Sequence, residues 1–307
     1  MQGIEASRKF YTDAVKPMIE RDFAQYKHRI AVGLVGHGSE CFGFDDSVST
    51  DHDFETSLCL WITREDEQKF GFKLFRAYSK LQTQYSAQSR SEKSIGGSDG
   101  RGVMTIEEFY KRYTGRNGAP ETLEDWLYIP SHYLAEATNG EVFCDELGVF
   151  SEVRETIKNG MPEDVRRKKI ASCAFYMAQS GQYNYERCLM HGERGAARLA
   201  LDEFVKNALE ISFLLEGAHM PYYKWSFRAL RELGQDDIAQ RLESLINAPA
   251  ESTKSISSEI EQISLDAIQK LVSSGLSDSG DKYLEAHAYS INSKIADHKL
   301  RNAPVML

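Results

Sequence analysis

The amino-acid sequence predicts an α+β fold, in which a small mixed β-sheet is followed by an all-helical C-terminal domain. Short apolar runs bounded by glycine and polar residues, which are typical of strands, occur before about residue 150. After that point, apolar residues recur every three or four positions, as on one face of a helix. A chain of 307 residues with 41% hydrophobic content is long enough for two cores. We therefore expect domains at 1–150 and 151–307.

The first domain is expected to open with an amphipathic helix. Apolar residues at helical spacing run from Ile4 to Tyr26, and the following apolar run Ile30–Val35 ends at glycines, which indicates a buried strand and a tight turn. The other elements expected here are strands within Phe54–Ile62, near Val103–Ile106 and at Gly140–Asp145, a helix at 63–82 and a long loop at 83–102.

The second domain is expected to contain helices only. Pro162, followed by two acids, is typical of a first helical turn. The clearest helix is Arg198–Leu215, which has an apolar stripe opposite charged residues, and further helices are expected at 255–274 and 281–300. The basic run Arg166–Lys169 is interpreted as a solvated helix face.

Composition excludes several classes of protein. A formal charge of −9 and a pI near 5.5 argue against an extended nucleic-acid surface. The polar N-terminus and the lack of a long apolar run predict no secretion signal and no membrane span. Five cysteines without a C-x-x-C pair predict reduced thiols rather than a disulfide framework or a zinc site. A cytoplasmic location is expected, and the sequence does not indicate an oligomeric state.

The segment between the first two predicted strands carries the chemistry. Gly38 and Ser39 follow the first strand, and a glycine-serine turn offers backbone N–H groups to the β- and γ-phosphates of a nucleotide. Asp51 and Asp53 precede the second strand, where alternation puts both carboxylates on one face. Such a pair requires a cation, so the pattern predicts Mg²⁺ or Mn²⁺ bridging to phosphate. The alternative is an ordinary acidic turn.

These residues resemble a known signature. Gly38-Ser39 followed by Asp51-His52-Asp53-Phe54 is similar to the signature of the DNA polymerase β-type nucleotidyltransferases, which include the aminoglycoside and lincosamide nucleotidyltransferases. Together with Pro221–Trp225, the segment also resembles a bacterial family of unknown function within that superfamily, over most of residues 30–230. The resemblance implies transfer of a nucleoside monophosphate from ATP or another nucleoside triphosphate to a small-molecule hydroxyl, with AMP as the first candidate for the transferred group. A catalytically weakened nucleotide-binding or regulatory protein is the alternative.

Members that catalyse transfer usually have a third acid on a following strand. The predicted strand Val103–Ile106 contains no acid, and Glu107 and Glu108 after it are typical of a helix start. Asp145 is the favoured third acid and third metal ligand, with a solvated loop acid as the equal alternative.

The resemblance also implies a helical domain that closes over the nucleotide and supplies cations. Lys224 is the first candidate for a phosphate contact, followed by Arg194 and Arg198, and Glu203 is the candidate general base. For each of them the alternative is an ordinary surface side chain.

Overall fold

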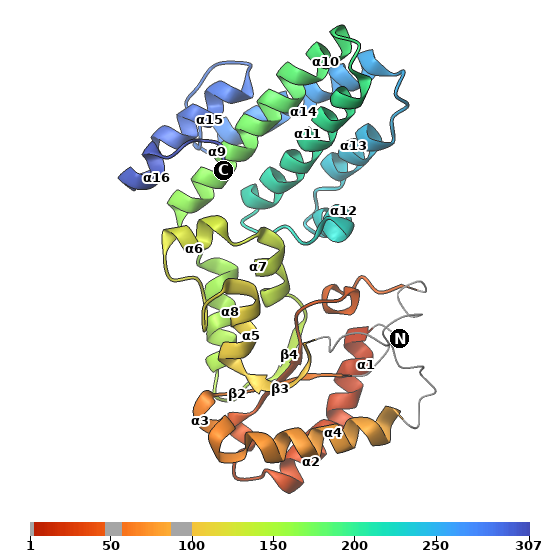
Figure 1. The fold of residues 1–307 in the computed structure, drawn as a ribbon, viewed down its shortest axis with the longest axis vertical. Helices are drawn as coiled ribbons and strands as arrows, with labels where there is room; N and C mark the ends of the chain where they lie inside the picture. Colours follow the sequence, from red (N-terminus) through yellow and green to blue (C-terminus); the bar gives the residue numbers. More distant parts are fainter. Residues whose placement is uncertain (1–2, 47–56, 87–99) are drawn as a thin grey trace. The chain divides into compact units, whose positions relative to one another are not determined.

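The structure, a computed structural model, describes residues 3–46, 57–86 and 100–307. It divides into a sheet unit, Met1–Asp125 with Ile129–Gly160, and a helical unit, Trp126–Tyr128 with Met161–Leu307 (Figure 1). The α+β class is therefore confirmed. The expected boundary at 150 falls inside α8 (Val149–Asn159), a helix of the sheet unit.

The sheet unit contains one four-stranded mixed sheet in the order β3-β2-β1-β4. Its strands are β1 (Ala31–Leu34), β2 (Cys59–Ile62), β3 (Gly102–Thr105) and β4 (Glu141–Cys144). Its helices are α1 (Gly3–Phe10), α2 (Lys16–Asp22), α3 (Arg64–Asp66), α4 (Phe72–Ser86), α5 (Ile106–Thr114), α7 (Ser131–Thr138) and α8, and α6 (Leu123–Tyr128) is shared between the units.

Strand direction determines what lies at each edge of the sheet. β1 runs antiparallel to both β2 and β4, with Gly33 opposite Cys59 and Leu34 opposite Glu141, whereas β2 and β3 are parallel. The end of β1 and the beginnings of β2, β3 and β4 therefore share one edge, which we call the turn edge.

The two central strands, β1 and β2, are buried on both faces, which explains why they are apolar throughout. Leu60 and Ile62 of β2 belong to a core that also includes residues of α1, α2 and α4. Trp61, which alternates to the opposite face, stacks on Phe150 of α8 at 3.7 Å between ring centroids and meets Phe109 of α5 edge-on.

The helical unit is built around α9 (Glu163–Met177), which is buried on nearly all sides. Its other helices are α10 (Glu186–Met190), α11 (Arg194–Leu215), α12 (Tyr223–Glu232), α13 (Asp236–Asn247), α14 (Thr253–Ser273), α15 (Leu284–Ser293) and α16 (His298–Asn302). The prediction of a single helix at 281–300 is wrong. Asp297 accepts the Leu300 N–H at 2.7 Å and so caps the separate helix α16. Among the described residues, no helix is both long enough and apolar enough to cross a membrane.

Candidate functional site

A glycine-rich turn follows β1 at the turn edge. Gly36 and Gly38 both have φ +120°, a region that side chains disfavour. A Cβ on Gly36 would lie 2.7 Å from the Tyr113 hydroxyl oxygen, and one on Gly38 would lie 2.5 Å from a Glu40 carboxylate oxygen. Backbone conformation therefore favours glycine at both positions, and the Tyr113 hydroxyl also limits the space at Gly36.

Hydrogen bonds hold this turn in place. The Gly36 N–H donates to Asn139 Oδ1, and Asn139 Nδ2 donates back to the Gly36 carbonyl oxygen, each at 2.8 Å. Ser39 then begins a short 3₁₀ turn, Ser39–Phe42. Within the described parts of the chain, the N–H groups of Gly38 and Ser39 have no hydrogen-bond acceptor. Two adjacent unpaired N–H groups on a glycine turn form the kind of concavity that binds phosphate oxygens.

A buried cation lies beside the turn. Arg101, the residue before β3, is 7% exposed in its side chain and forms an ion pair with Glu40. Its Nη2 also donates to the His37 carbonyl oxygen at 3.2 Å. Burial raises the pKa of the Cys41 thiol next to it, so the thiol stays neutral. Sequence reasoning missed Arg101, because it lies at the end of a loop rich in serine and glycine.

A buried acid also lies beside the turn. Glu136 of α7 is 7% exposed, and its Oε1 lies 3.3 Å from Nδ1 of His37, whose side chain is 70% exposed. This pair places a carboxylate and an imidazole next to Gly38. No local motif in the sequence distinguishes Glu136 from other helix residues.

Asp145, the favoured third acid, lies at the opposite edge of the sheet. It follows β4, whose last residue Cys144 pairs with Val32 near the beginning of β1. Both of its carboxylate oxygens are occupied, since they accept the N–H groups of Gly148 at 3.0 Å and Ser151 at 2.8 Å. The structure therefore places Asp145 at the beginning of α8 and away from the turn edge, and its role as a metal ligand and catalytic acid stays a prediction.

This placement predicts how an Asp145 variant behaves. Asp145→Ala is expected to lower the free energy of unfolding by about 1 kcal/mol through loss of the two hydrogen bonds that Asp145 accepts at the beginning of α8, and to leave nucleotide affinity unchanged. Urea unfolding and calorimetric titration with Mg²⁺-ATP measure the two effects. Loss of nucleotide binding by a folded Asp145→Ala variant would instead show that Asp145 belongs to the nucleotide site.

The cations predicted in the helical unit do not lie together. Arg194 begins α11, a helix of 22 residues, whereas Lys224 belongs to α12 beyond the other end of α11 (Figure 1). At about 1.5 Å per residue the two ends are roughly 33 Å apart, several times the length of a triphosphate. Arg198 lies near the Arg194 end, where it donates to the Ile246 carbonyl oxygen and lies 3.5 Å from Asp202. Arg194 and Lys224 are therefore too far apart to contact one triphosphate together, and each stays a separate candidate.

Lys224 is placed differently from the two arginines. Arg166, in the first turn of α9, donates to the Leu214 carbonyl oxygen at 3.3 Å, so the end of α11 that precedes Lys224 in the chain lies beside the beginning of α9. Lys224 is exposed, with its Nζ 5.0 Å from the Trp225 ring centroid. Glu203 lies in the middle of α11 and accepts from Asn207 Nδ2 at 2.9 Å.

Asp51 and Asp53 lie outside the described residues. Among the residues described, no group of three or more His, Cys, Asp or Glu side chains could hold a metal ion. The predicted metal site therefore depends on these two aspartates, which precede β2 and so lead into the turn edge.

Comparison with known proteins gives two findings. Residues 126–226 match the family described as "Domain of unknown function (DUF4037)". The resemblance to a family of unknown function is therefore confirmed for this segment, which includes Glu136 and Lys224 but not the glycine turn. No curated protein matches the chain.

The second finding is a solved structure. A nucleotidyltransferase-like protein from Exiguobacterium sibiricum 255-15 aligns over 86% of this chain and 76% of its own, with 13% sequence identity and a TM-score of 0.37. Similarity at this level establishes neither a common fold nor a common activity. Neither finding extends to the antibiotic nucleotidyltransferases.

Proposed function

We propose that the protein is a nucleotidyltransferase. It would transfer a nucleoside monophosphate from a nucleoside triphosphate to a hydroxyl group of a small molecule, and AMP is the first candidate for the transferred group. One observation carries the proposal, namely the set of groups at the turn edge of the sheet. The glycine turn Gly36–Ser39, the cation of Arg101 and the chain from Asp51 and Asp53 all lie at or lead into this edge.

The turn would bind the phosphates. The N–H groups of Gly38 and Ser39 are available to phosphate oxygens, and the Ser39 hydroxyl adds a third donor. Arg101 lies beside the turn, where its ion pair with Glu40 offsets the negative charge of that carboxylate. Asp51 and Asp53 would hold Mg²⁺ or Mn²⁺, which supplies charge that offsets the negative charge of the reacting phosphates.

In the proposed reaction the acceptor hydroxyl oxygen forms a bond to the α-phosphorus, the bond between that phosphorus and the α,β-bridging oxygen breaks, and pyrophosphate leaves. The hydroxyl proton passes to a base. The His37–Glu136 pair is our candidate, because an imidazole oriented by a carboxylate is suited to this role and lies next to Gly38. Glu203, the base expected from the sequence, and Lys224 remain candidates from the helical unit.

A second function is favoured by the position of Asp145. Asp145 lies at the opposite sheet edge and Glu40 is engaged by Arg101, so neither of these two described acids is available at the turn edge as the third acid. A protein that binds a nucleotide without transferring it would require only the turn and the aspartate pair. Incubation with α-labelled ATP, Mg²⁺ and a metabolite extract distinguishes the two functions, since binding without any transfer of label contradicts a transferase.

The site itself is tested by Asp51→Asn combined with Asp53→Asn. The double variant removes two charges with little change in shape, so Mg²⁺-dependent ATP binding is expected to weaken at least about tenfold, while the free energy of unfolding changes by less than about 0.5 kcal/mol. Isothermal titration calorimetry with and without Mg²⁺ gives the affinity. Asp236→Asn combined with Asp237→Asn, at the beginning of α13, removes the same charge elsewhere and should leave binding unchanged. Retained Mg²⁺-dependent binding in the first variant contradicts the assignment.

A further inference from the structure

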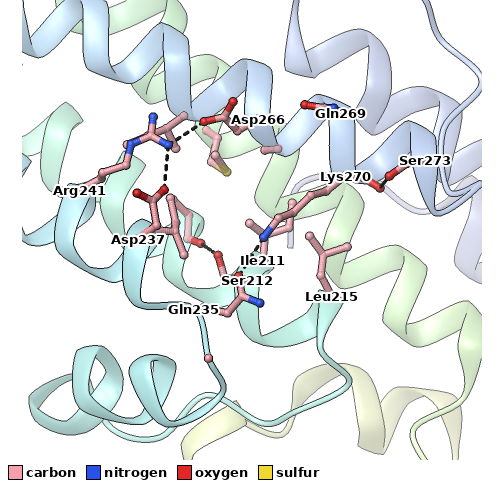
Figure 2. A pocket seen from close by; sticks show the side chains of 16 residues that line it. Ile211, Ser212, Leu215, Gln235, Asp237, Arg241, Asp266, Gln269, Lys270 and Ser273 are labelled. Atoms are coloured by element: carbon pink, nitrogen blue, oxygen red, sulfur yellow. Dashed lines mark hydrogen bonds and ion pairs between the residues drawn. The ribbon is translucent and has the colours of Figure 1, made fainter.

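The helical unit contains a cavity of about 450 Å³ that the proposed nucleotide chemistry does not use (Figure 2). This volume lies within the range of small-molecule sites, which occur between the helices of bundles. Helices α11, α13 and α14 supply most of its walls. Seven apolar side chains line it: Met177, Ala208, Ile211, Leu215, Ile238, Ile263 and Ala267.

On one part of the rim, carboxylates are already paired with Arg241. Nη1 of Arg241 lies 2.7 Å from Asp266 Oδ2 and 3.5 Å from Asp237 Oδ2 (Figure 2). Nε of Arg241 also lies 2.6 Å from Glu259. The second oxygen of Asp266 accepts from Gln262 Nε2 at 3.1 Å. The two carboxylates that line the cavity are therefore both directed to Arg241 and not to Lys270.

Lys270 differs from Arg241 in its partners. Its Nζ donates to Gln235 Oε1 at 2.9 Å, and Figure 2 shows this contact apart from the Arg241 cluster. Asp266 lies one helical turn before Lys270 on α14, yet its carboxylate is directed to Arg241 and Gln262. Within the residues that the structure describes, no carboxylate lies in ion-pair distance of Lys270. An ammonium group has three donors and Gln235 uses one, so Lys270 can bind an anion at the rim.

We propose that this cavity is a binding site for a small molecule with an apolar body and a single anionic group. The apolar body would occupy the floor between α11 and α14, where burial of its surface provides most of the affinity. The anionic group would lie at Lys270 and away from the carboxylates around Arg241, so the rim determines the orientation of the ligand. The site lies within one unit and does not depend on the proposed transferase activity.

Two matched probes test the proposal on the full chain. The first is 8-anilinonaphthalene-1-sulfonate, which is apolar with one negative charge, and the second is the uncharged N-phenyl-1-naphthylamine. Fluorescence titration, with stoichiometry from calorimetry, should give one saturable site per chain for each probe. Lys270→Gln is expected to weaken sulfonate binding about tenfold, and to change binding of the uncharged probe by less than about twofold. Lys206→Gln, an exposed lysine on α11 outside the cavity, is the control and should affect neither probe.

A second variant tests the location. Ala267→Trp places a large side chain in the cavity from the partly exposed face of α14, so both probes should lose binding while the unfolding transition is retained. Each of three results overturns the proposal: no saturable binding of the sulfonate, an equal effect of Lys270→Gln on both probes, or normal binding by Ala267→Trp. Because Lys270 is an exposed rim residue, its variant is expected to fold, and the charge test does not depend on the cavity-filling variant.

Discussion

Gly140→Ala is expected to destabilise the sheet unit by roughly 2–4 kcal/mol, from left-handed backbone strain and from overpacking. Gly140 precedes β4 with φ +63°, and a Cβ there would lie 1.9 Å from the carbonyl oxygen of Leu34, the last residue of β1. Because the obstructing atom belongs to the backbone, the ends of the two strands would have to separate. The neighbouring Asn139 also holds Gly36, so nucleotide affinity should fall together with stability.

Gly115→Ala is the matched control for this effect. Gly115 ends α5 with φ +70°, but nothing lies within 4 Å of a Cβ built there. Its substitution should therefore cost only the backbone strain, roughly 1 kcal/mol. Urea unfolding of both variants measures the difference. Equal losses of stability in the two variants would contradict a close approach between β4 and β1.

The sequence predicts those parts of the fold that depend on neighbouring residues. The strands β1 and β2 are buried on both faces, so they are continuous apolar runs, and Gly36 and Gly38 indicate where the first of them ends. The acids Glu107 and Glu108 correctly indicate a helix start, since Thr105 and Glu108 form a capping box for α5. Local signals of this kind are short in range, and the sequence shows them directly.

The site depends on pairings that the sequence does not show. Asp145 is predicted on a strand, and it does follow one, but the antiparallel direction of β4 puts it at the edge away from Gly38. Arg101 reaches Glu40 across 61 residues, and Glu136 reaches His37 across 99. Only the register of the sheet and the packing of α7 bring these groups together, so no spacing rule could have identified them.

The basic run Arg166–Lys169 shows the same limit in the helical unit. Its interpretation as a solvated face is wrong for Lys168 and Lys169, which are buried. Three of the four cations instead donate to carbonyl oxygens at the ends of other helices. Arg166 donates to Leu214 in α11, Arg167 to Lys294 after α15 at 3.0 Å, and Lys168 to Ala303 after α16 at 2.8 Å. Helix C-termini present unpaired carbonyl groups, which explains why a charged run belongs in the middle of a helical bundle.

Lys168 is the member of this run with the largest expected contribution to stability. Its side chain is fully buried, and its Nζ donates to Asn292 Oδ1 and to the Ala303 carbonyl oxygen, each at 2.8 Å. Lys168→Ala leaves two buried acceptors without a donor and a cavity in place of the stem, so we expect a loss of roughly 2–4 kcal/mol. Lys168→Met retains most of the apolar volume and should lose only about 1–2 kcal/mol. Lys206→Ala, an exposed lysine on α11, should change stability by less than about 0.5 kcal/mol.

The pH dependence of stability separates the charge of Lys168 from its packing. Burial lowers the pKa of Lys168, so the folded protein holds this proton less tightly than the unfolded chain does. The charged form therefore costs stability near neutral pH, and this cost falls as the pH rises through the lowered pKa. Lys168→Met carries no such proton. The stability of the wild-type protein relative to Lys168→Met should therefore increase from about pH 7 to about pH 10 in urea unfolding. A constant or decreasing difference would mean that Lys168 is not buried in its charged form.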